Sequence, residues 1–439
     1  MIVALSAPDG PKAGGAGSTW RLRRKDIAVK LEDLIFISVD DHVLEPPDMF
    51  KGRMPCGMSD RGPRFAAGEN GQGHWLIDNA ESPWTMNYSV MRPGAWQADQ
   101  RIEEMSSIGI LGSLCFPSFP RFAGQLFMQV NDRALGLASV QAYNNWMVEE
   151  WAGAHPDRLI PLGLMPLWDP SAMADEVRRI AKLGVHVVAF SENPSKLGLP
   201  SIYDDKFWKP FWTACCDEGT VVATHIGSSS SLPKTSDDCS MEATGVMIPL
   251  NLYGTAADYV WSNVFRQYGP LKLLLAEGGT GWVPFFLERC EINYKARPWV
   301  RKEYGPKSPV EVFKEHVITC FIEDKPGIAL RHEIGIDNIC WEFDYPHGDC
   351  LWPDGLEFAY QSYLSSMPQD EADKITHLNA MKHLRFDPFA LRSRESCTVG
   401  ALRATAGPRY EGTVTGGFWD SALGEREAAW RSGAVPADA

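Results

Sequence analysis

The sequence predicts an α/β fold, a (β/α)8 TIM barrel with long insertions at its rim and a C-terminal extension. Eight short apolar runs, rich in Val, Ile, Leu and Phe, follow one another along the 439 residues with helical intervals between them. These runs rarely alternate with polar residues, which is typical of parallel strands that are buried on both faces. Several of them end directly on a histidine or an acid, which indicates functional side chains at the carboxyl rim of a barrel.

The expected strands lie at about residues 34–40, 110–116, 159–165, 185–190, 220–225, 271–276, 317–322 and 338–343. The helical intervals include residues 132–154, 170–183, 205–218 and 282–294. Strand and helix therefore alternate along the chain, as βα units require.

Three regions are expected along the chain. Residues 1–30 are rich in Gly, Ala and Pro and then basic, and we expect a flexible N-terminal segment. Residues 31–390 form the metal-dependent barrel, with insertions at about 46–100 and 226–260, and residues 391–439 form the C-terminal extension. The first insertion is rich in Pro, Gly and Trp, and connections of that length usually form lids or binding walls.

The charge and composition of the chain limit the kinds of binding partner that we expect. The formal charge is −14 and no basic patch stands out, so we expect no nucleic-acid partner. No apolar stretch is long enough to span a bilayer, and the N-terminus lacks the apolar core of a secretory signal, so we expect a cytoplasmic protein with no membrane partner. The ten cysteines include no CxxC pair, which favours reduced thiols.

Acids and histidines at the ends of the apolar runs form a candidate metal site. The candidate ligands are Asp40, His42, Glu45, His225, Glu277, Asp344 and His347. A carboxylate buried at a barrel mouth needs a cation or a hydrogen-bonding partner, because removing its charge from water is costly. Several such carboxylates repel one another, and a divalent metal relieves that repulsion.

The carboxylates in this set outnumber the imidazoles, and an oxygen-rich set suits iron or manganese better than zinc. Seven candidates exceed the needs of one ion, so we expect two iron ions bridged by a carboxylate such as Glu277. Some alternatives stay open. Glu45 and Glu277 could orient a ligand through a hydrogen bond, and His347 could act as a general acid or base. The candidate catalytic residues are His225, Asp344 and His347.

These segments resemble the amidohydrolase superfamily, and most of all its amidohydrolase 2 branch, which is related to aminocarboxymuconate-semialdehyde decarboxylase. The matching stretches are Val39–Asp48, Thr224–Gly227, Glu277–Pro284 and Asp344–His347. The resemblance spans about residues 34–390. It implies a (β/α)8 barrel, a divalent metal at the strand ends, and a homodimer.

Two departures from the family pattern favour a particular subset of the superfamily. The sequence Asp40-x-His42 stands where the family usually has His-x-His, and Glu277 stands where a histidine often precedes Gly-Gly. In these positions the chain resembles non-haem di-iron monooxygenases such as the hydroxylase of platensimycin and platencin biosynthesis. That resemblance implies two iron ions, O2 and an electron donor.

Two alternative functions are therefore expected. The first is an O2-dependent di-iron monooxygenase that hydroxylates an apolar small molecule, such as a terpenoid or another natural-product intermediate. Its pocket wall would come from the aromatic residues of the rim loops, namely Trp75, Trp84, Trp96, Phe116, Phe119, Phe122 and Trp352. The second is a metal-dependent hydrolase or non-oxidative decarboxylase of a small carboxylate or amide, in which Asp344 or His347 moves the proton.

Overall fold

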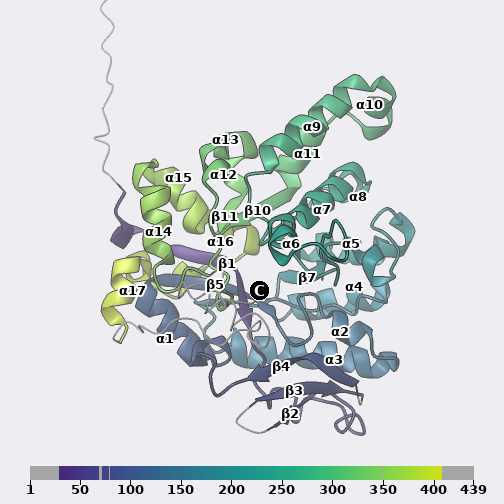
Figure 1. Ribbon diagram of the computed structural model, residues 1–439, viewed down its shortest axis with the longest axis vertical. Coiled ribbons are helices and arrows are strands. Elements are labelled where there is room, and N and C mark those ends of the chain that lie inside the picture. The colour runs from purple at the N-terminus through teal and green to yellow at the C-terminus, as the bar shows by residue number, and fades with distance from the viewer. Residues whose placement is uncertain (1–28, 69–71, 79, 349, 408–439) are drawn as a thin grey trace, which may run out of the picture.

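The computed structural model describes residues 29–68, 72–78, 80–348 and 350–407 (Figure 1). Within these ranges the side chains of residues 80, 81, 83 and 84 are not described. Most of the expected N-terminal segment and the last part of the C-terminal extension, residues 408–439, therefore lie outside the described residues.

Eight parallel strands form the centre of the molecule. They are β1 (Phe36–Val43), β5 (Ile110–Pro117), β6 (Leu159–Ile160), β7 (Val187–Ser191), β8 (Val221–His225), β9 (Leu273–Ala276), β10 (Val317–Phe321) and β11 (Ile339–Trp341). Hydrogen bonding orders them as β1-β5-β6 and β11-β10-β9-β8-β7, and every pair among them is parallel. Each expected strand region overlaps one of these strands. Their residues are almost entirely buried, which explains the apolar runs of the sequence.

Backbone hydrogen bonds join the two sets of strands into a closed ring. On one side, the Gly163 N–H donates to Val187 O and the Ala189 N–H donates to Gly163 O, each at 2.9 Å. On the other side, the Asp344 N–H donates to Asp40 O at 2.8 Å and the His42 N–H donates to Tyr345 O at 2.7 Å. The ring confirms the (β/α)8 barrel that the sequence predicts.

Helices surround the barrel (Figure 1). They are α1 (Ala98–Ile108), α2 (Gln125–Met128), α3 (Arg133–Trp146), α4 (Pro170–Ala181), α5 (Asp205–Glu218), α6 (Met241–Met247), α7 (Leu250–Trp261), α8 (Val264–Gln267), α9 (Val283–Ala296), α10 (Pro298–Tyr304), α11 (Pro309–His316), α12 (Lys325–Ala329), α13 (Arg331–Ile334), α14 (Gly355–Ser362), α15 (Gln369–Asp373), α16 (Asn379–Leu384) and α17 (Val399–Thr405). A π-helical turn at Met147–Trp151 extends α3.

Short polar side chains mark where these helices begin. Asp132 accepts hydrogen bonds from the backbone N–H groups of Ala134 and Leu135 at the start of α3. Asp169 caps α4 in the same way, and Pro170 occupies the first helical position. Such caps satisfy N–H groups that have no partner inside the helix, so the sequence defines these starts locally.

The first insertion is more ordered than the sequence suggests. It contains an antiparallel sheet of β2 (Arg64–Ala67), β3 (Gln72–Ile77) and β4 (Ala80–Asn87), which lies beside α3 (Figure 1). Trp75 of β3 is fully buried and stacks on Phe119 with ring centroids 4.4 Å apart, while Phe50 packs against both rings. Trp75 and Phe119 therefore attach this sheet to the barrel.

The second insertion and the start of the C-terminal extension also have helical structure. Residues 226–260 contain α6 and most of α7. In the extension, α17 packs beside the start of β1: the Val399 N–H donates to Leu34 O at 2.8 Å, and Arg403 donates to Ile108 O at the end of α1. Among the described residues, no helix combines the length and the apolar character needed to cross a bilayer.

A glycine permits the closure between β6 and β7. A Cβ atom at Gly163 would lie 2.3 Å from Cδ1 of the buried Ile180. We expect Gly163→Ala to lower the free energy of unfolding by about 1–3 kcal/mol, because a packed core resists added volume. Urea denaturation measures this change. Gly269→Ala is the matched control, because no heavy atom lies within 4 Å of its Cβ position; equal stability of the two variants would contradict the argument.

Candidate metal centre

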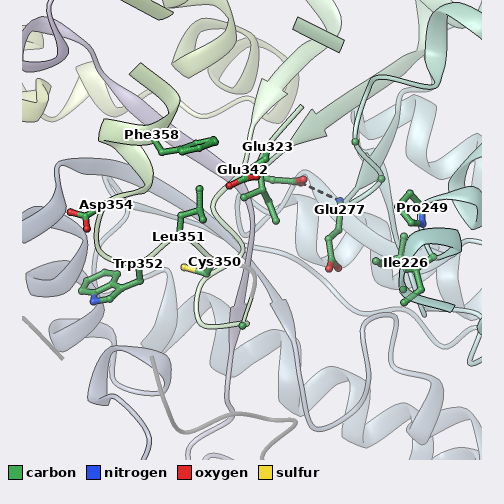
Figure 2. Close-up of a pocket in the computed structure, with 16 residues that line it drawn as sticks. Ile226, Pro249, Glu277, Glu323, Glu342, Cys350, Leu351, Trp352, Asp354 and Phe358 are labelled. Carbon is green, nitrogen blue, oxygen red and sulfur yellow. Dashed lines mark hydrogen bonds between the residues drawn. The ribbon is translucent and has the colours of Figure 1, made fainter. Parts of the chain in front are cut away.

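A cleft of about 920 Å³ opens at the carboxyl ends of the later barrel strands. Its walls come from residues that directly follow β8, β9, β10 and β11 and from the junction of α6 and α7. Figure 2 shows Glu277 between Ile226 and Pro249 on one side and Glu342 and Leu351 on the other. The cleft therefore lies at the rim where the sequence predicts the chemistry.

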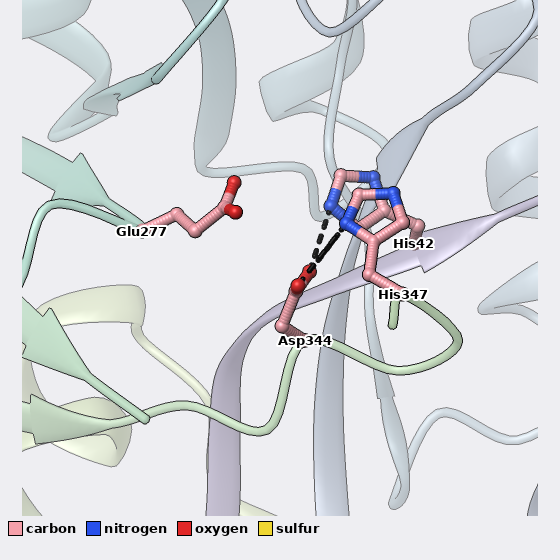
Figure 3. A group of neighbouring side chains, drawn as sticks. All are labelled: His42, Glu277, Asp344 and His347. Atoms are coloured by element: carbon pink, nitrogen blue, oxygen red, sulfur yellow. Dashed lines mark hydrogen bonds and ion pairs between the residues drawn. The ribbon is translucent and has the colours of Figure 1, made fainter. Parts of the chain in front are cut away.

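Six of the seven predicted ligands meet at this rim. Asp40 and His42 are on β1, His225 ends β8, Glu277 follows β9, and Asp344 and His347 follow β11. Their potential ligand atoms form two groups, each within 4.8 Å: His42, Glu277, Asp344 and His347 in one, and Asp40, His42 and His225 in the other. Figure 3 shows the side chains of the first group pointing toward one another. His42 belongs to both groups.

The distances within the cluster are short. His42 Nε2 lies 3.1 Å from Asp344 Oδ1 and 3.2 Å from His225 Nε2. His225 Nε2 in turn lies 3.0 Å from Glu277 Oε2 and 3.4 Å from Asp40 Oδ2. His347 Nδ1 is 2.9 Å from Asp344 Oδ1. The side chains of Asp40 and Asp344 are fully buried, so their charge needs a partner close by.

The imidazoles can act as neutral ligands. His225 Nδ1 lies 2.6 Å from the carbonyl oxygen of Ile226, so this nitrogen carries a proton and Nε2 is the nitrogen that faces the cluster. Burial holds the pKa of His42 well below its ordinary value, and the neighbouring His347 and His225 act in the same direction. His42 Nε2 and His225 Nε2 lie 3.2 Å apart, so both nitrogens could bind the same cation.

The arrangement fits a divalent cation. Metal–ligand bonds of roughly 2.0–2.2 Å allow two ligands of one ion to lie up to about 4.4 Å apart, which is close to the spacing within each group. Buried carboxylates and neutral imidazoles supply the charge and the lone pairs that such an ion needs. The residues that would hold it are Asp40, His42, His225, Glu277 and Asp344. His347, beside Asp344, could serve as a further ligand or as an acid or base.

Two of the acidic residues have strained backbone conformations. Glu277 has φ 63° and Asp344 has φ 58°, in the left-handed region that side chains other than glycine seldom adopt. Each such residue costs on the order of 1–3 kcal/mol. The Glu277 N–H donates to Glu342 Oε2 at 3.1 Å and the Asp344 N–H donates to Asp40 O, which offsets part of that cost. Strain of this kind gathers at functional sites.

Glu45, which the sequence predicts as a ligand, lies outside both ligand groups. Its carboxylate is fully buried and accepts hydrogen bonds from the backbone N–H groups of Ser118 at 3.0 Å and Phe119 at 2.7 Å. Both oxygens thus bind the loop after β5. Glu45 follows β1 by two residues, and the turn there directs its side chain toward β5 instead of the ligands.

Asp41 is not a member of either ligand group. It is buried, and its carboxylate accepts hydrogen bonds from the Tyr345 N–H at 2.9 Å and from the Ser113 hydroxyl. Burial raises the pKa of Asp41 to about 6. Asp41 lies between two ligands on β1, and its side chain points to the opposite face of the strand.

The aromatic residues expected to line an apolar pocket have different roles. Of the seven, Trp352 is the one that lines the cleft among the residues that the structure describes. Phe122 packs on His225 and His42, with ring centroids 4.2 and 5.1 Å apart, and Phe116 also contacts both imidazoles. Trp96 packs against Tyr88. The Trp84 side chain lies outside the described residues.

Two acids that the sequence analysis did not select contribute to the site. Glu342 lines the cleft and binds the Glu277 backbone. Glu192 directly follows β7 and accepts hydrogen bonds from the Ser229 hydroxyl at 2.7 Å and the Gly227 N–H at 3.1 Å, which holds the loop after His225. Two sequence signals could have identified these acids. Glu192 directly follows an apolar run, as the predicted ligands do, and Glu342 is a charged residue within an apolar run.

We expect Glu277→Ala to bind less metal than the wild-type protein, because it removes a carboxylate from one ligand group. Elemental analysis after equilibration with Mn²⁺ and gel filtration measures the stoichiometry. The control is Glu323→Ala, which removes an exposed carboxylate from the wall of the same cleft. Wild-type stoichiometry in Glu277→Ala would show that Glu277 is not a ligand.

Glu45 is expected to affect the pH dependence of stability. Burial raises the pKa of Glu45 from its ordinary 4.5 to about 7. The folded protein therefore binds this proton more tightly than the unfolded chain, and the associated stability is present below pH 4.5 and is lost as the pH rises through 7.

The stability of the wild type relative to Glu45→Gln should thus fall between these pH values, by at most about 3 kcal/mol. Urea unfolding at a series of pH values tests this, and the difference isolates Glu45 from other titrating groups. A difference that does not change with pH would contradict it.

Comparisons with known proteins agree with this geometry. The amidohydrolase family profile matches residues 47–386, which begins just after the β1 ligands. A solved amidohydrolase from Mycobacterium avium subsp. paratuberculosis K-10 is 22% identical with a TM-score of 0.64, covering 80% of this chain and 99% of its own. A dihydroxybenzoic acid decarboxylase from Polaromonas sp. JS666, with bound manganese and 2-nitroresorcinol, is 17% identical with a TM-score of 0.58, covering 82% and 99%.

A 5-carboxyvanillate decarboxylase from Novosphingobium aromaticivorans DSM 12444, also with bound manganese, is 16% identical with a TM-score of 0.57, covering 82% of this chain and 100% of its own. At these identities the structures support the fold, while the profile match extends over most of the chain. Together with the ligand cluster at the barrel rim, it shows that the chain belongs to the amidohydrolase family, within a superfamily of metal-dependent enzymes.

Proposed function

We propose that the protein is a metal-dependent, non-oxidative decarboxylase of a small aromatic carboxylate. The observation that carries this proposal is the pair of Asp344 and His347, whose Oδ1 and Nδ1 atoms lie 2.9 Å apart at the edge of the ligand cluster. The pair can move a proton beside a cation that would hold a substrate carboxylate. Two proteins of similar structure are decarboxylases of hydroxylated aromatic acids with manganese bound, which supports this choice.

The reaction needs a proton and no oxidant. A divalent cation at this site would supply Lewis acidity and hold the substrate carboxylate or a neighbouring hydroxyl group. The Asp344–His347 pair delivers a proton to the ring carbon that bears the carboxylate. The C–C bond then breaks, its electrons return to the ring, and CO2 leaves. Hydrolysis of an amide would use the same pair with water as the nucleophile.

The negative charge of the cleft limits which substrates can bind. The charged residues that line it within the described chain are all acids: Glu277, Glu323, Glu342 and Asp354. No lysine, arginine or histidine is among these described lining residues. A second anionic group far from the metal would meet only like charges, whereas a hydroxyl or amino group would find acceptors. We therefore propose a monocarboxylate with neutral or cationic substituents.

A second candidate is the O2-dependent di-iron monooxygenase. The specific observation in its favour is that the two ligand groups share His42 and together contain three carboxylates and three imidazoles, an arrangement that could hold two iron ions. The apolar side chains of Ile226, Leu351 and Phe358 in the cleft would suit an apolar natural-product substrate. This reaction would need O2 and an electron donor, so metal content and oxygen dependence separate the two candidates.

The first test is CO2 release without oxygen. The apoprotein is loaded with Mn²⁺ under anaerobic conditions and supplied with hydroxybenzoates, aminohydroxybenzoates and dicarboxylated phenols. We expect CO2 from the monocarboxylates and little from the dicarboxylates. Release that occurs only with O2, iron and a reductant would overturn the proposal in favour of the monooxygenase.

The proton-moving pair is tested separately. His347→Gln should lower kcat by about 10²–10⁴-fold, the usual contribution of a general acid or base. Its Mn²⁺ content is measured in the same preparation, so that metal loss and proton transfer are told apart. His332→Gln is the control, because His332 is exposed on α13 and pairs with Glu371. An unchanged kcat in His347→Gln would exclude His347 from proton transfer.

A further inference from the structure

Helix α1 packs against the chain segments that carry the metal centre. Two of its buried side chains, Arg101 and Glu104, lie one turn apart and reach the two chain segments that carry ligands. One segment is the end of β1, with Asp40 and His42. The other follows β11 and begins with Asp344. Neither α1 side chain belongs to the ligand groups.

The side chain of Arg101 binds the backbone of the β1 segment. The guanidinium Nη2 donates to the carbonyl oxygen of His42, and Nε donates to Gly94 O at 2.6 Å. Nη1 lies 3.4 Å from Cys115 Sγ on β5 and 4.0 Å from Asp41 Oδ2. The side chain is 1% exposed. Three separate nitrogen atoms thus bind three elements, which the planar fork of arginine can do and the single ammonium of lysine cannot.

The same guanidinium reaches the segment after β11 through Tyr345. Its Cζ atom lies 4.3 Å from the centroid of the Tyr345 ring, a cation–π contact. The Tyr345 hydroxyl donates to Glu104 Oε2 at 2.5 Å, and the Tyr345 N–H donates to Asp41 Oδ1. Glu104 is itself held by the N–H of Gly94 at 3.0 Å. Arg101 therefore contacts both ligand-bearing segments at once.

Neighbouring residues on each segment face opposite sides, so the contacts with α1 also position the ligands. Asp41 stands between Asp40 and His42, and Tyr345 stands next to Asp344. Asp41 and Tyr345 face α1, while their neighbours face the metal centre. A shift of either segment against α1 would therefore change the 3.1 Å separation between His42 Nε2 and Asp344 Oδ1.

We propose that Arg101 is a positioning residue of the metal centre, which sets the geometry of His42 and Asp344 by holding the backbone of β1 and the ring of Tyr345. The proposal depends on the metal centre and not on the reaction assigned above. Its measured quantity is therefore metal binding, which stays informative if the protein proves not to be a decarboxylase.

A second buried arginine provides the matched control. Arg158 is 2% exposed and, like Arg101, donates to backbone carbonyl groups, those of Leu111 and, at 2.9 Å, Ile110. It also reaches Ser106 of α1, at 3.1 Å. These contacts lie at the start of β5, at the opposite end of the barrel from the ligands. A lysine at either position keeps the positive charge but lacks the planar guanidinium group with its several N–H donors.

The experiment compares Arg101→Lys with Arg158→Lys in the full-length protein. Mn²⁺ affinity is measured by titration, the Mn²⁺ environment by electron paramagnetic resonance, and stability by urea unfolding. We expect both variants to be less stable. Arg101→Lys should also bind Mn²⁺ about 10–100-fold more weakly, as is usual when a residue that orients ligands is lost, with an altered Mn²⁺ spectrum. Arg158→Lys should keep the wild-type affinity and spectrum.

Wild-type Mn²⁺ affinity in Arg101→Lys, or an equal loss in both variants, would overturn the proposal and leave Arg101 as a structural residue of the core. If Arg101→Lys does not fold, Tyr345→Phe replaces it. That variant keeps the ring under the guanidinium and removes only the hydroxyl group that binds Glu104. It should weaken Mn²⁺ binding several-fold and alter the Mn²⁺ spectrum, and unchanged binding would count against the proposal.

Discussion

The pairing of β1 with the segment after β11 is the constraint on which the rest of the structure depends. Two backbone hydrogen bonds, from Asp344 to Asp40 and from His42 to Tyr345, connect parts of the chain that are about three hundred residues apart. They close the barrel and at the same time place the candidate ligands Asp40, His42 and Asp344 beside one another. Closure and metal site therefore form together, and a change that loosens one loosens the other.

The cost of burying charge explains the composition of the site. Asp40 and Asp344 are fully buried within a few ångströms of imidazole rings, and Glu277 and Asp344 adopt strained conformations. A folded chain keeps such an arrangement only if the surrounding structure holds it, as α1 and the loops after β5 and β7 do. A bound cation would compensate the charge, so metal binding and stability are expected to be coupled in this protein.

Part of this site could be predicted because the relevant signals are local. Buried parallel strands are apolar runs, and an acid or histidine that ends such a run lies at the carboxyl rim whatever its distance in sequence from the others. That argument located His225, Glu277 and Asp344 correctly at the rim. It failed for Glu45, because a carboxylate near a strand end can equally bind backbone N–H groups. The separate expectation that Trp75 and Phe119 line the pocket did not anticipate that they stack on each other and attach the insertion to the barrel.

The sequence by itself determined the barrel, the order of its strands, and the presence of histidines and acids at one rim, because periodicity and strand-end position are properties of short segments. Only the tertiary structure decided which of these side chains meet. That choice depends on backbone conformation at single residues, such as the left-handed φ of Glu277 and Asp344, and on contacts between distant segments, such as Arg101 with His42 and Tyr345. Neither leaves a periodic signal in the chain.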